Sequence, residues 1–303
     1  MPIRYIEYQQ IDKLKWDTCI DTAGNGLVYA YSFYLDTMAK HWDALILNDY
    51  EAVMPLTWNK KYGINYLYQP FFTAVLGVFS KNISESVVTD FLNSIPAKFK
   101  YWDIYLNNAN RFKLPNYSLY ERMNYILPLN DNYEKLYANF RNNIKRNIKK
   151  SINLNCIVKK NIDIADVIIL AQEQSKNFSP VTSQDHDSFK KVYCYFHQQK
   201  KAITYGIYSI KGQLLASAAF LFSHGRAYYI LVGNHPNSKN YGASHLLINA
   251  FIKDNAEQNL LLDLEGSDVP GLAFFYGSFG AIEEKYAGLK LNRLPLWMKW
   301  FQK

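Results

Sequence analysis

Apolar and polar residues alternate along the chain with two spacings, one typical of strands and one typical of helices. In the first half, short apolar runs bounded by turn residues predict strands, and apolar residues three or four positions apart predict helices. The predicted strands are Ile3–Tyr8, Ala44–Leu47, Ala52–Thr57, Ile64–Tyr68, Trp102–Leu106 and Tyr120–Leu127, and the predicted helices are Ile11–Thr22, Ser32–Trp42 and Glu85–Phe99.

The second half of the chain repeats this order. Its predicted strands are Asn155–Val158, Ile203–Ile210, Leu214–Phe222, Ala227–Val232, Leu260–Leu264 and Glu284–Lys290, and its predicted helices are Ile164–Lys176, Asp187–Gln199, Gly242–Asn259 and a short one at Gly271–Phe279. Three antiparallel strands followed by a helix and a parallel strand predict a mixed α/β sheet covered by helices. We therefore expect two similar domains, residues 1–130 and 152–303, joined by a helical linker at 131–151.

Composition narrows the class of protein. The chain has 303 residues, of which 49% are hydrophobic, so each half has enough apolar area for its own core. A net charge of +8 favours anionic partners such as a phosphorylated cofactor, nucleic acid or an acidic membrane surface. No segment approaches the ~20 apolar residues of a spanning helix and no signal peptide is visible, so we expect a cytoplasmic protein without stable membrane insertion.

Several chemistries find no support in the sequence. The three cysteines and six histidines lack the spacings of a zinc site, and the dispersed cysteines indicate a reducing compartment, so we expect no metal. Neither a GxSxG nucleophile elbow nor a GxxxxGK[ST] phosphate loop occurs in the chain.

The order of elements is that of the GNAT acyltransferase fold, and its duplication resembles the Fem-type (FemAB-like) aminoacyl- and peptidyltransferases. The stretches that carry the likeness are Phe140–Lys150, Gly212–Ala216, Asn240–Leu247, Leu262–Ser267 and Phe274–Ala281. The resemblance implies two tandem GNAT-like domains and transfer of an acyl group from acyl-CoA, or of an aminoacyl group from aminoacyl-tRNA. Where the family commonly has a lysine, this chain has Tyr276, which cannot supply a fixed positive charge.

The resemblance also implies a donor site in the second half. GNAT enzymes bind the donor's pyrophosphate at a turn that opens a helix, because free N–H groups and the helix dipole attract phosphate. The matching residues are Lys239, Asn240, Tyr241, Gly242, Ala243 and Ser244. A plain helix cap is the alternative. The strand with Leu231 and Val232, followed by Gly233, would part from the next strand and expose an edge to the donor, or else be an ordinary buried strand.

Candidate catalytic residues follow the next strand. Asp263 and Glu265 are two positions apart and would share one face at the strand end, so either could be the general base. A structural carboxylate that caps the next turn is the alternative. Tyr276 and Tyr286 are candidate acids. Tyr286 and Tyr229 are also expected to contact the substrate. Packing in the core is the alternative role for all three tyrosines.

The helix at Phe140–Lys150 has an apolar stripe and a basic face, with Arg141 and Lys145 as candidate contacts to an anionic acceptor. A solvated helix face is the alternative. The leading hypothesis is an N-acyltransferase whose N-terminal half shapes a cleft for the acceptor, a small amine or a cell-wall precursor. A non-catalytic module that binds an anionic glycan or a lipid head group is the second hypothesis. Sequence-tolerant binding of nucleic acid, tRNA included, is the third.

Overall fold

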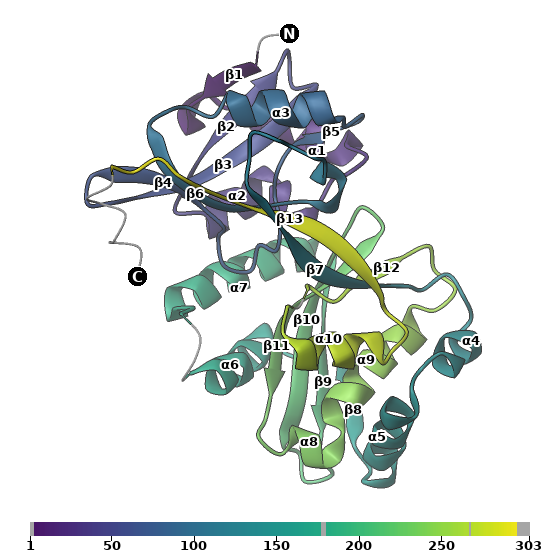
Figure 1. The fold of residues 1–303 in the computed structure, drawn as a ribbon. Helices are drawn as coiled ribbons and strands as arrows, with labels where there is room; N and C mark the ends of the chain where they lie inside the picture. The colour runs from purple at the N-terminus through teal and green to yellow at the C-terminus, as the bar shows by residue number, and fades with distance from the viewer. Residues whose placement is uncertain (1–2, 177–179, 267, 296–303) are drawn as a thin grey trace. The chain divides into compact units, whose positions relative to one another are not determined.

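The computed structural model describes residues 3–176, 180–266 and 268–295, and the chain forms two compact units (Figure 1). Unit 1 comprises residues up to Arg122 together with those from Lys285 onward, and unit 2 comprises Met123–Glu284. The two boundaries fall inside strands β7 (Leu119–Pro128) and β13 (Ile282–Asn292). Each of these strands therefore contributes residues to both units.

Unit 1 is a sheet with helices on both faces. Its strands are β1 (Ile3–Ile6), β2 (His41–Leu47), β3 (Ala52–Lys61), β4 (Ile64–Tyr68), β5 (Phe79–Ser80) and β6 (Phe99–Leu106), and its helices are α1 (Lys13–Thr22), α2 (Ser32–Met38) and α3 (Glu85–Asn93). The strand order is β1-β2-β3-β4-β6-β13, with β5 beside β3. Only the β4–β6 pair is parallel among the pairs described within this unit.

Burial explains why unit 1 has a helix layer on each face. All five residues from Trp42 to Ile46 in β2 are buried, so neither side of this strand faces water. Helix α3 begins at the cap residue Ser84 and packs Val88, Phe91 and Leu92 on one face of the sheet. A strand buried on both faces needs covering layers on both sides.

Unit 2 has the same architecture. Its strands are β8 (Ile157–Lys160), β9 (Ala202–Tyr208), β10 (Leu214–Ser223), β11 (Arg226–Asn234) and β12 (Leu261–Asp263), and its helices are α4 (Tyr133–Ala138), α5 (Asn142–Asn153), α6 (Ile164–Ser175), α7 (Ser183–Gln198), α8 (Ser238–Tyr241), α9 (Ala243–Asp254) and α10 (Pro270–Gly277). The strand order is β7-β12-β11-β10-β9-β8, and among the described pairs only β11–β12 is parallel.

The core of unit 2 lies between the sheet and helices α5 and α9. Phe220 on β10 stacks on Phe251 of α9, with ring centroids 3.9 Å apart. Ile144 and Ile148 of α5 are buried in the same cluster, which confirms the apolar stripe predicted for this helix. Helices α6 and α7 pack on the sheet as well, α6 mainly against β11 (Figure 1).

The duplicated order predicted from the sequence is confirmed. In each unit a first strand and two helices precede three antiparallel strands, and a helix then leads to a strand that pairs in parallel with the third of them. The predicted mixed α/β sheet is therefore present in each unit.

The division of the chain differs from the predicted one. The segment 131–151, predicted as a linker, forms α4 and most of α5, and Leu136, Phe140 and Ile144 belong to the core of unit 2. The end of the second half, Ala287–Asn292 of β13, pairs with β6 of unit 1. Local sequence pattern identifies a strand but not the strand that pairs with it.

Three predicted helices end four or more residues earlier than the apolar pattern indicated. The helix predicted to reach Trp42 ends at Met38, because His41 and Trp42 already belong to β2. The helix predicted to reach Phe99 ends at Asn93, since Pro96 cannot continue it and Phe99 begins β6. The long helix predicted at Gly242–Asn259 is observed at Ala243–Asp254.

Candidate functional site

The candidate site lies in unit 2, where strands β11 and β12 stop pairing. Only Arg226–Tyr228 of β11 pairs with β12, opposite Leu261–Asp263, whereas β11 itself continues to Asn234. The family resemblance implied such a separation, with an ordinary buried strand as the alternative. Sites in α/β proteins commonly lie at the carboxyl ends of strands, because loops carrying polar groups leave the sheet there.

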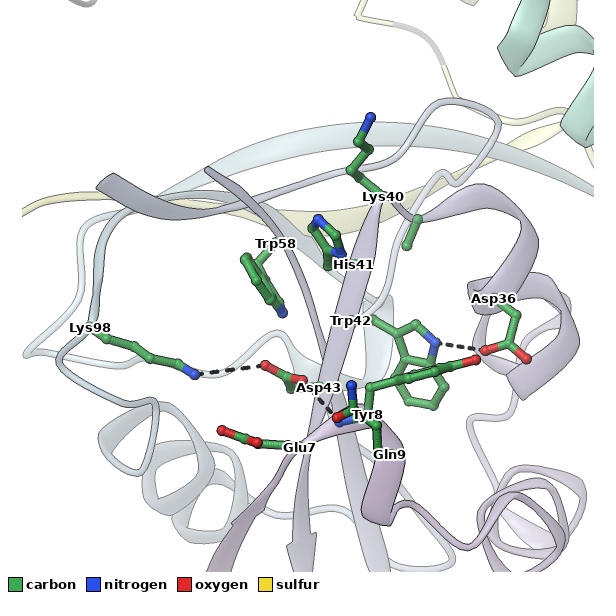
Figure 2. A pocket seen from close by; sticks show the side chains of 11 residues that line it. Glu7, Tyr8, Gln9, Asp36, Lys40, His41, Trp42, Asp43, Trp58 and Lys98 are labelled. Atoms are coloured by element: carbon green, nitrogen blue, oxygen red, sulfur yellow. Dashed lines mark hydrogen bonds and ion pairs between the residues drawn. The ribbon is translucent and has the colours of Figure 1, made fainter. Parts of the chain in front are cut away.

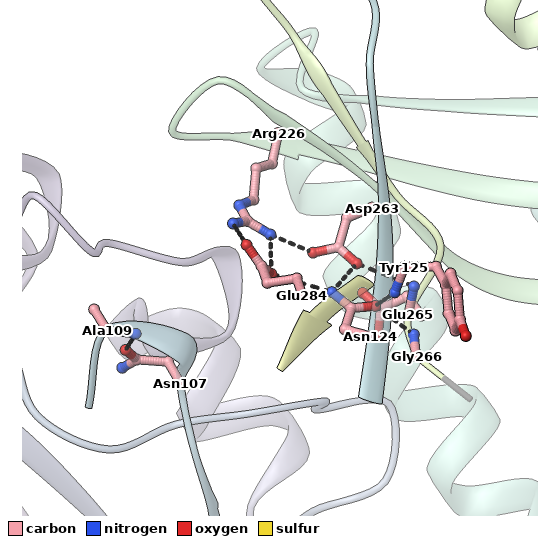
Figure 3. Close-up of polar contacts among 9 residues, drawn as sticks. All are labelled: Asn107, Ala109, Asn124, Tyr125, Arg226, Asp263, Glu265, Gly266 and Glu284. Carbon is pink, nitrogen blue, oxygen red and sulfur yellow. Dashed lines mark hydrogen bonds and ion pairs between the residues drawn. The ribbon is translucent and has the colours of Figure 1, made fainter. Parts of the chain in front are cut away.

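A charged cluster holds this end of β12 in place (Figure 3). Arg226 Nη1 lies 2.8 Å from Asp263 Oδ2, and Arg226 Nη2 lies 2.5 Å from Glu284 Oε1. The three side chains are only 12%, 8% and 14% exposed. Burial opposes the charge on Arg226, but the hydrogen bond to Glu284 and the charges of both carboxylates outweigh it, so the arginine pKa is raised. The arginine therefore remains charged and holds strands β11, β12 and β13 together at one point.

Asn124 of β7 extends this cluster to the turn after β12. Its side-chain nitrogen donates to Asp263 Oδ1 at 2.9 Å, and its side-chain oxygen accepts from the backbone N–H of Gly266 at 2.6 Å. The same oxygen also accepts from the N–H of Tyr125 at 2.8 Å. The turn that carries Glu265 is consequently fixed from both sides (Figure 3).

Glu265 has an unusual backbone and an unusual acidity. Its φ is 60°, in the left-handed region that residues other than glycine rarely adopt. Gly266 follows with a φ of 70°, and an added Cβ there would lie 2.9 Å from the carbonyl oxygen of Met123. Burial raises the pKa of Glu265 to about 8. Strained backbone and a displaced pKa occur together at many functional sites, because the surrounding structure must stabilise both.

Tyr276 is the neighbour of Glu265 from helix α10. Burial, and after it the charge of Glu265, raise the pKa of this phenol, so it stays protonated at neutral pH. Its ring lies 6.3 Å from that of Tyr125, whose N–H is bound by Asn124. The structure thus brings together the predicted pair Glu265 and Tyr276, and adds Tyr125 to it.

The prediction that Asp263 and Glu265 share one strand face is wrong. Strand β12 ends at Asp263, and the left-handed conformation of Glu265 breaks the alternation on which the prediction depended. Asp263 also has both oxygens engaged, one with Arg226 and one with Asn124 and the backbone N–H of Glu265. It therefore corresponds to the structural alternative and is a poor general base.

The predicted phosphate turn has a different local structure. Gly242 separates α8 from α9 with a φ of 67°, and an added Cβ would lie 2.5 Å from the carbonyl oxygen of Asn147 on α5. The glycine is thus required for close packing of α5, and both Gly242 and Ala243 are buried. Lys239 and Asn240 are exposed, and Tyr241 is half-buried. Ser244 donates to the side chain of Asn234 at the end of β11, at 2.6 Å.

Strand β11 carries three further predicted donor contacts. Leu231 is buried, Val232 is half-buried, and an added Cβ on Gly233 would lie 2.7 Å from the backbone nitrogen of Ala171. Helix α6 therefore packs directly on the end of β11 that has no pairing with β12. Tyr229 is 4% exposed and packs in the core beside Phe220, so its predicted contact with the substrate is not supported by its position.

The remaining predicted residues, Arg141, Lys145 and Tyr286, have contacts with other parts of the protein. The guanidinium of Arg141 is 5.0 Å from the ring centroid of Phe274, and Lys145 Nζ donates to the carbonyl oxygen of Ala138 at 2.9 Å. Tyr286 belongs to unit 1, where its ring contacts that of Tyr105 and the guanidinium of Arg122. The structure does not place Tyr286 in unit 2 with the other candidates.

Sequence reasoning did not identify Arg226, Asn124, Tyr125 or Glu284. An arginine at the head of an otherwise apolar strand was the one available signal, since a buried charge requires a partner. Its partners come from β12 and β13, and those pairings are not visible in the sequence.

Known structures identify the fold. No family model and no curated protein matches the sequence. FemX superimposes with a TM-score of 0.63 at 12% identity, covering 94% of this chain and 96% of FemX. A conserved protein of unknown function from Bacteroides thetaiotaomicron gives 0.62 at 12% identity over 95% and 99% of the two chains. L-PGS from Bacillus licheniformis gives 0.59 at 10% identity over 96% and 95%. The chain therefore has a Fem-like fold.

At these identities the likeness to FemX and L-PGS concerns the fold alone. Within residues 3–176, 180–266 and 268–295, no helix has the length and apolar character required to cross a membrane. In the same residues no three histidine, cysteine, aspartate or glutamate side chains gather closely enough to hold a metal ion.

Proposed function

We propose that this protein is an N-acyltransferase that moves an acyl group from acyl-CoA, or an aminoacyl group from aminoacyl-tRNA, to an amine. The acceptor would be a small amine or an amine-bearing cell-wall precursor, and the reaction would take place in the cytoplasm. The observation that supports this most is Glu265, a carboxylate with a pKa of about 8 beside the phenol of Tyr276, at the point where β11 and β12 separate.

The two side chains suit the two proton transfers that acyl transfer requires. An amine that attacks the carbonyl carbon of a thioester or ester must lose a proton, and the carboxylate of Glu265 can accept it. As the carbonyl re-forms and the bond to the thiolate or tRNA oxygen breaks, the hydroxyl of Tyr276 can protonate the leaving group. A base with a pKa near the working pH is the most effective, because it is partly ionised and still strongly basic.

The Arg226 cluster would act by positioning. Asp263, Glu284 and Asn124 hold the turn on which Glu265 is carried, but their own polar atoms are engaged with one another. A general base must remain in place within a fraction of an ångström of the proton that it removes. A buried ion-pair network with several strands attached provides such a support.

The donor would bind along the end of β11, with its phosphates toward the exposed Lys239 and Asn240. The packing of α5 over Gly242 is an observation against a pyrophosphate held on the backbone of that glycine, and it favours a second candidate function. In this alternative the Fem-like fold binds an anionic glycan or lipid head group without transfer chemistry. The aminoacyl-tRNA donor requires no such turn and remains part of the first proposal.

The two candidates differ in what Glu265 does. Calorimetry measures donor binding, with acetyl-CoA at millimolar and a pool of aminoacyl-tRNAs at micromolar concentration. Transfer to a panel of primary amines is measured by release of the CoA thiol or by deacylation of the tRNA. We expect Glu265→Gln to lower turnover at least about 100-fold while donor binding is kept. Glu173→Gln, a change of an exposed carboxylate on α6, is the matched control. If neither acetyl-CoA nor the aminoacyl-tRNA pool binds, the proposal of acyl transfer loses its basis.

A further inference from the structure

Unit 1 contains a pocket of about 460 Å³ that the proposed transfer site does not use (Figure 2). It lies at the turn Tyr8–Gln10, the end of α2 and the first residues of β2, with Trp58 of β3 and Lys98 completing its wall. All of its lining residues belong to unit 1. The volume is within the range of about 300–1,000 Å³ that small-molecule sites occupy.

Aromatic rings form much of the wall and are held in place without a ligand. The indole N–H of Trp42 donates to Asp36 Oδ1 at 3.0 Å, and the Trp42 ring makes edge contacts with Tyr8 at 5.8 Å and with Trp16 at 5.0 Å. Trp58 stacks on His41 with ring centroids 4.5 Å apart. Trp42 is only 2% exposed and supports the wall from behind, whereas Tyr8, at 37%, and the half-buried Trp58 present ring surface to a ligand at little cost in side-chain entropy.

One buried donor in the pocket has no hydrogen-bond partner. The indole nitrogen of Trp58 is shielded from solvent, and no acceptor in the described part of the chain reaches it. In Figure 2 this nitrogen points toward the interior of the pocket, on the side of Asp43 and Trp42. A buried N–H without a partner is unfavourable, so an acceptor atom of a ligand at this place would be stabilised.

The charges around the pocket select against an ionic ligand. Asp36 binds Lys13 at 2.7 Å, and Asp43 accepts from the Tyr8 N–H at 3.0 Å with Lys98 3.9 Å away. An organic cation would meet the ammonium group of Lys98. An anion would meet the carboxylates of Asp36 and Asp43 as well as that of Glu7. Both kinds of ion would therefore meet a like charge in the lining.

A neutral ligand rich in hydroxyl groups meets none of these obstacles. The side chains of Glu7 and Gln9 line the pocket and make no hydrogen bond within the described residues, so they are available as acceptor and as donor. Together with the N–H of Trp58 they present both hydrogen-bond polarities beside the exposed ring of Tyr8. A sugar has this combination of groups, because its ring carries hydroxyl groups and also has an apolar C–H face that can pack on an aromatic ring.

We propose that the pocket at Glu7, Tyr8 and Trp58 binds a neutral sugar residue, with the sugar's C–H face on an exposed aromatic ring of the wall and a hydroxyl oxygen accepting from the N–H of Trp58. The site stands on unit 1 alone. It therefore does not depend on transfer chemistry at Glu265, and a failure of either proposal leaves the other unaffected.

Saturation-transfer NMR and tryptophan fluorescence with glucose, galactose, mannose and N-acetylglucosamine test this proposal on the full chain. We expect at least one of them to bind with a Kd of about 1 mM, as is usual for a small polar ligand. Trp58→Phe keeps an aromatic ring and removes the N–H, so it should weaken binding about fivefold. Glu7→Gln should weaken it by a similar factor, whereas Asp90→Asn, an exposed change on α3, should leave it unaltered.

Choline chloride and sodium acetate complete the experiment, and melting temperatures establish that each variant is folded. The proposal is overturned if none of the four sugars binds at about 20 mM, roughly twenty times the expected Kd. It is also overturned if choline or acetate binds in their place, which would indicate a cation or anion site. Equal sugar affinity in the wild type and in both folded pocket variants would locate binding elsewhere.

Discussion

Replacing Glu265 by glutamine should change how the stability of the protein depends on pH. Burial raises the pKa of this carboxyl from its ordinary 4.5 to about 8, so the folded state binds the proton more tightly than the unfolded state. The contribution of this group to stability is complete below pH 4.5 and is lost as pH rises through about 8. Glutamine resembles the protonated acid at every pH and should not show this loss.

The magnitude follows from the two pKa values. One pKa unit corresponds to about 1.4 kcal/mol, so the full rise from 4.5 to about 8 corresponds to at most about 4.8 kcal/mol. The Glu265 side chain is only half-buried, and contact with water screens part of this energy. We therefore expect Glu265→Gln to gain about 2–3 kcal/mol of unfolding free energy relative to the wild type between pH 5 and pH 9.

Urea denaturation of both proteins at pH 5, 7 and 9 measures this difference, because groups that titrate equally in the two proteins cancel. Glu173→Gln, in which an exposed carboxylate of α6 is replaced, should show no pH-dependent difference from the wild type. A difference between Glu265→Gln and the wild type that stays constant within about 0.5 kcal/mol would refute the reasoning, because the carboxyl would then have an ordinary pKa.

Three further predictions concern the same unit and its controls. If Glu265 is the base, kcat/KM for transfer should rise about tenfold from pH 7 to pH 9, and a flat profile would argue against this role. Arg226→Ala should lower the unfolding free energy in urea by about 3–5 kcal/mol, because it leaves two buried carboxylates without a counter-charge. Arg111→Ala, which removes only the exposed ion pair with Glu121, should lower it by less than about 1 kcal/mol. Gly242→Ala should lower stability at least about 1 kcal/mol more than Gly212→Ala, since both glycines have a positive φ but only Gly242 contacts a neighbouring backbone; equal losses would contradict this packing.

The sequence by itself determined the order of elements and its repetition. Apolar spacing and turn residues located the strands of both halves, including Ile64–Tyr68 with the observed bounds. These signals are local, because a strand or helix side chain is buried or exposed according to its position in a short repeat. For the same reason the stripe of Ile144 and Ile148 and the strand end near Glu265 are recognisable from the amino-acid sequence alone.

The tertiary structure decided which of those residues act together. The pairings of β13 with β6 and of β7 with β12 set the limits of the two units. Within unit 2, side-chain contacts join Arg226 to partners 37 and 58 positions away in the chain. They also changed the interpretation of Asp263 from a possible base to a structural carboxylate. Backbone hydrogen bonds between strands are the same for any sequence, so the choice of neighbour depends on how all the elements pack.

The two glycine-containing turns illustrate the same limit at shorter range. The sequence indicated a glycine at position 242, and only the structure located the carbonyl oxygen of Asn147 against it. Likewise the left-handed backbone of Glu265 is stabilised by Asn124, a residue 141 positions earlier in the chain, through the N–H of Gly266. A sequence pattern records what each residue prefers locally, whereas pKa, strain and close contact depend on neighbours that only the folded chain brings together.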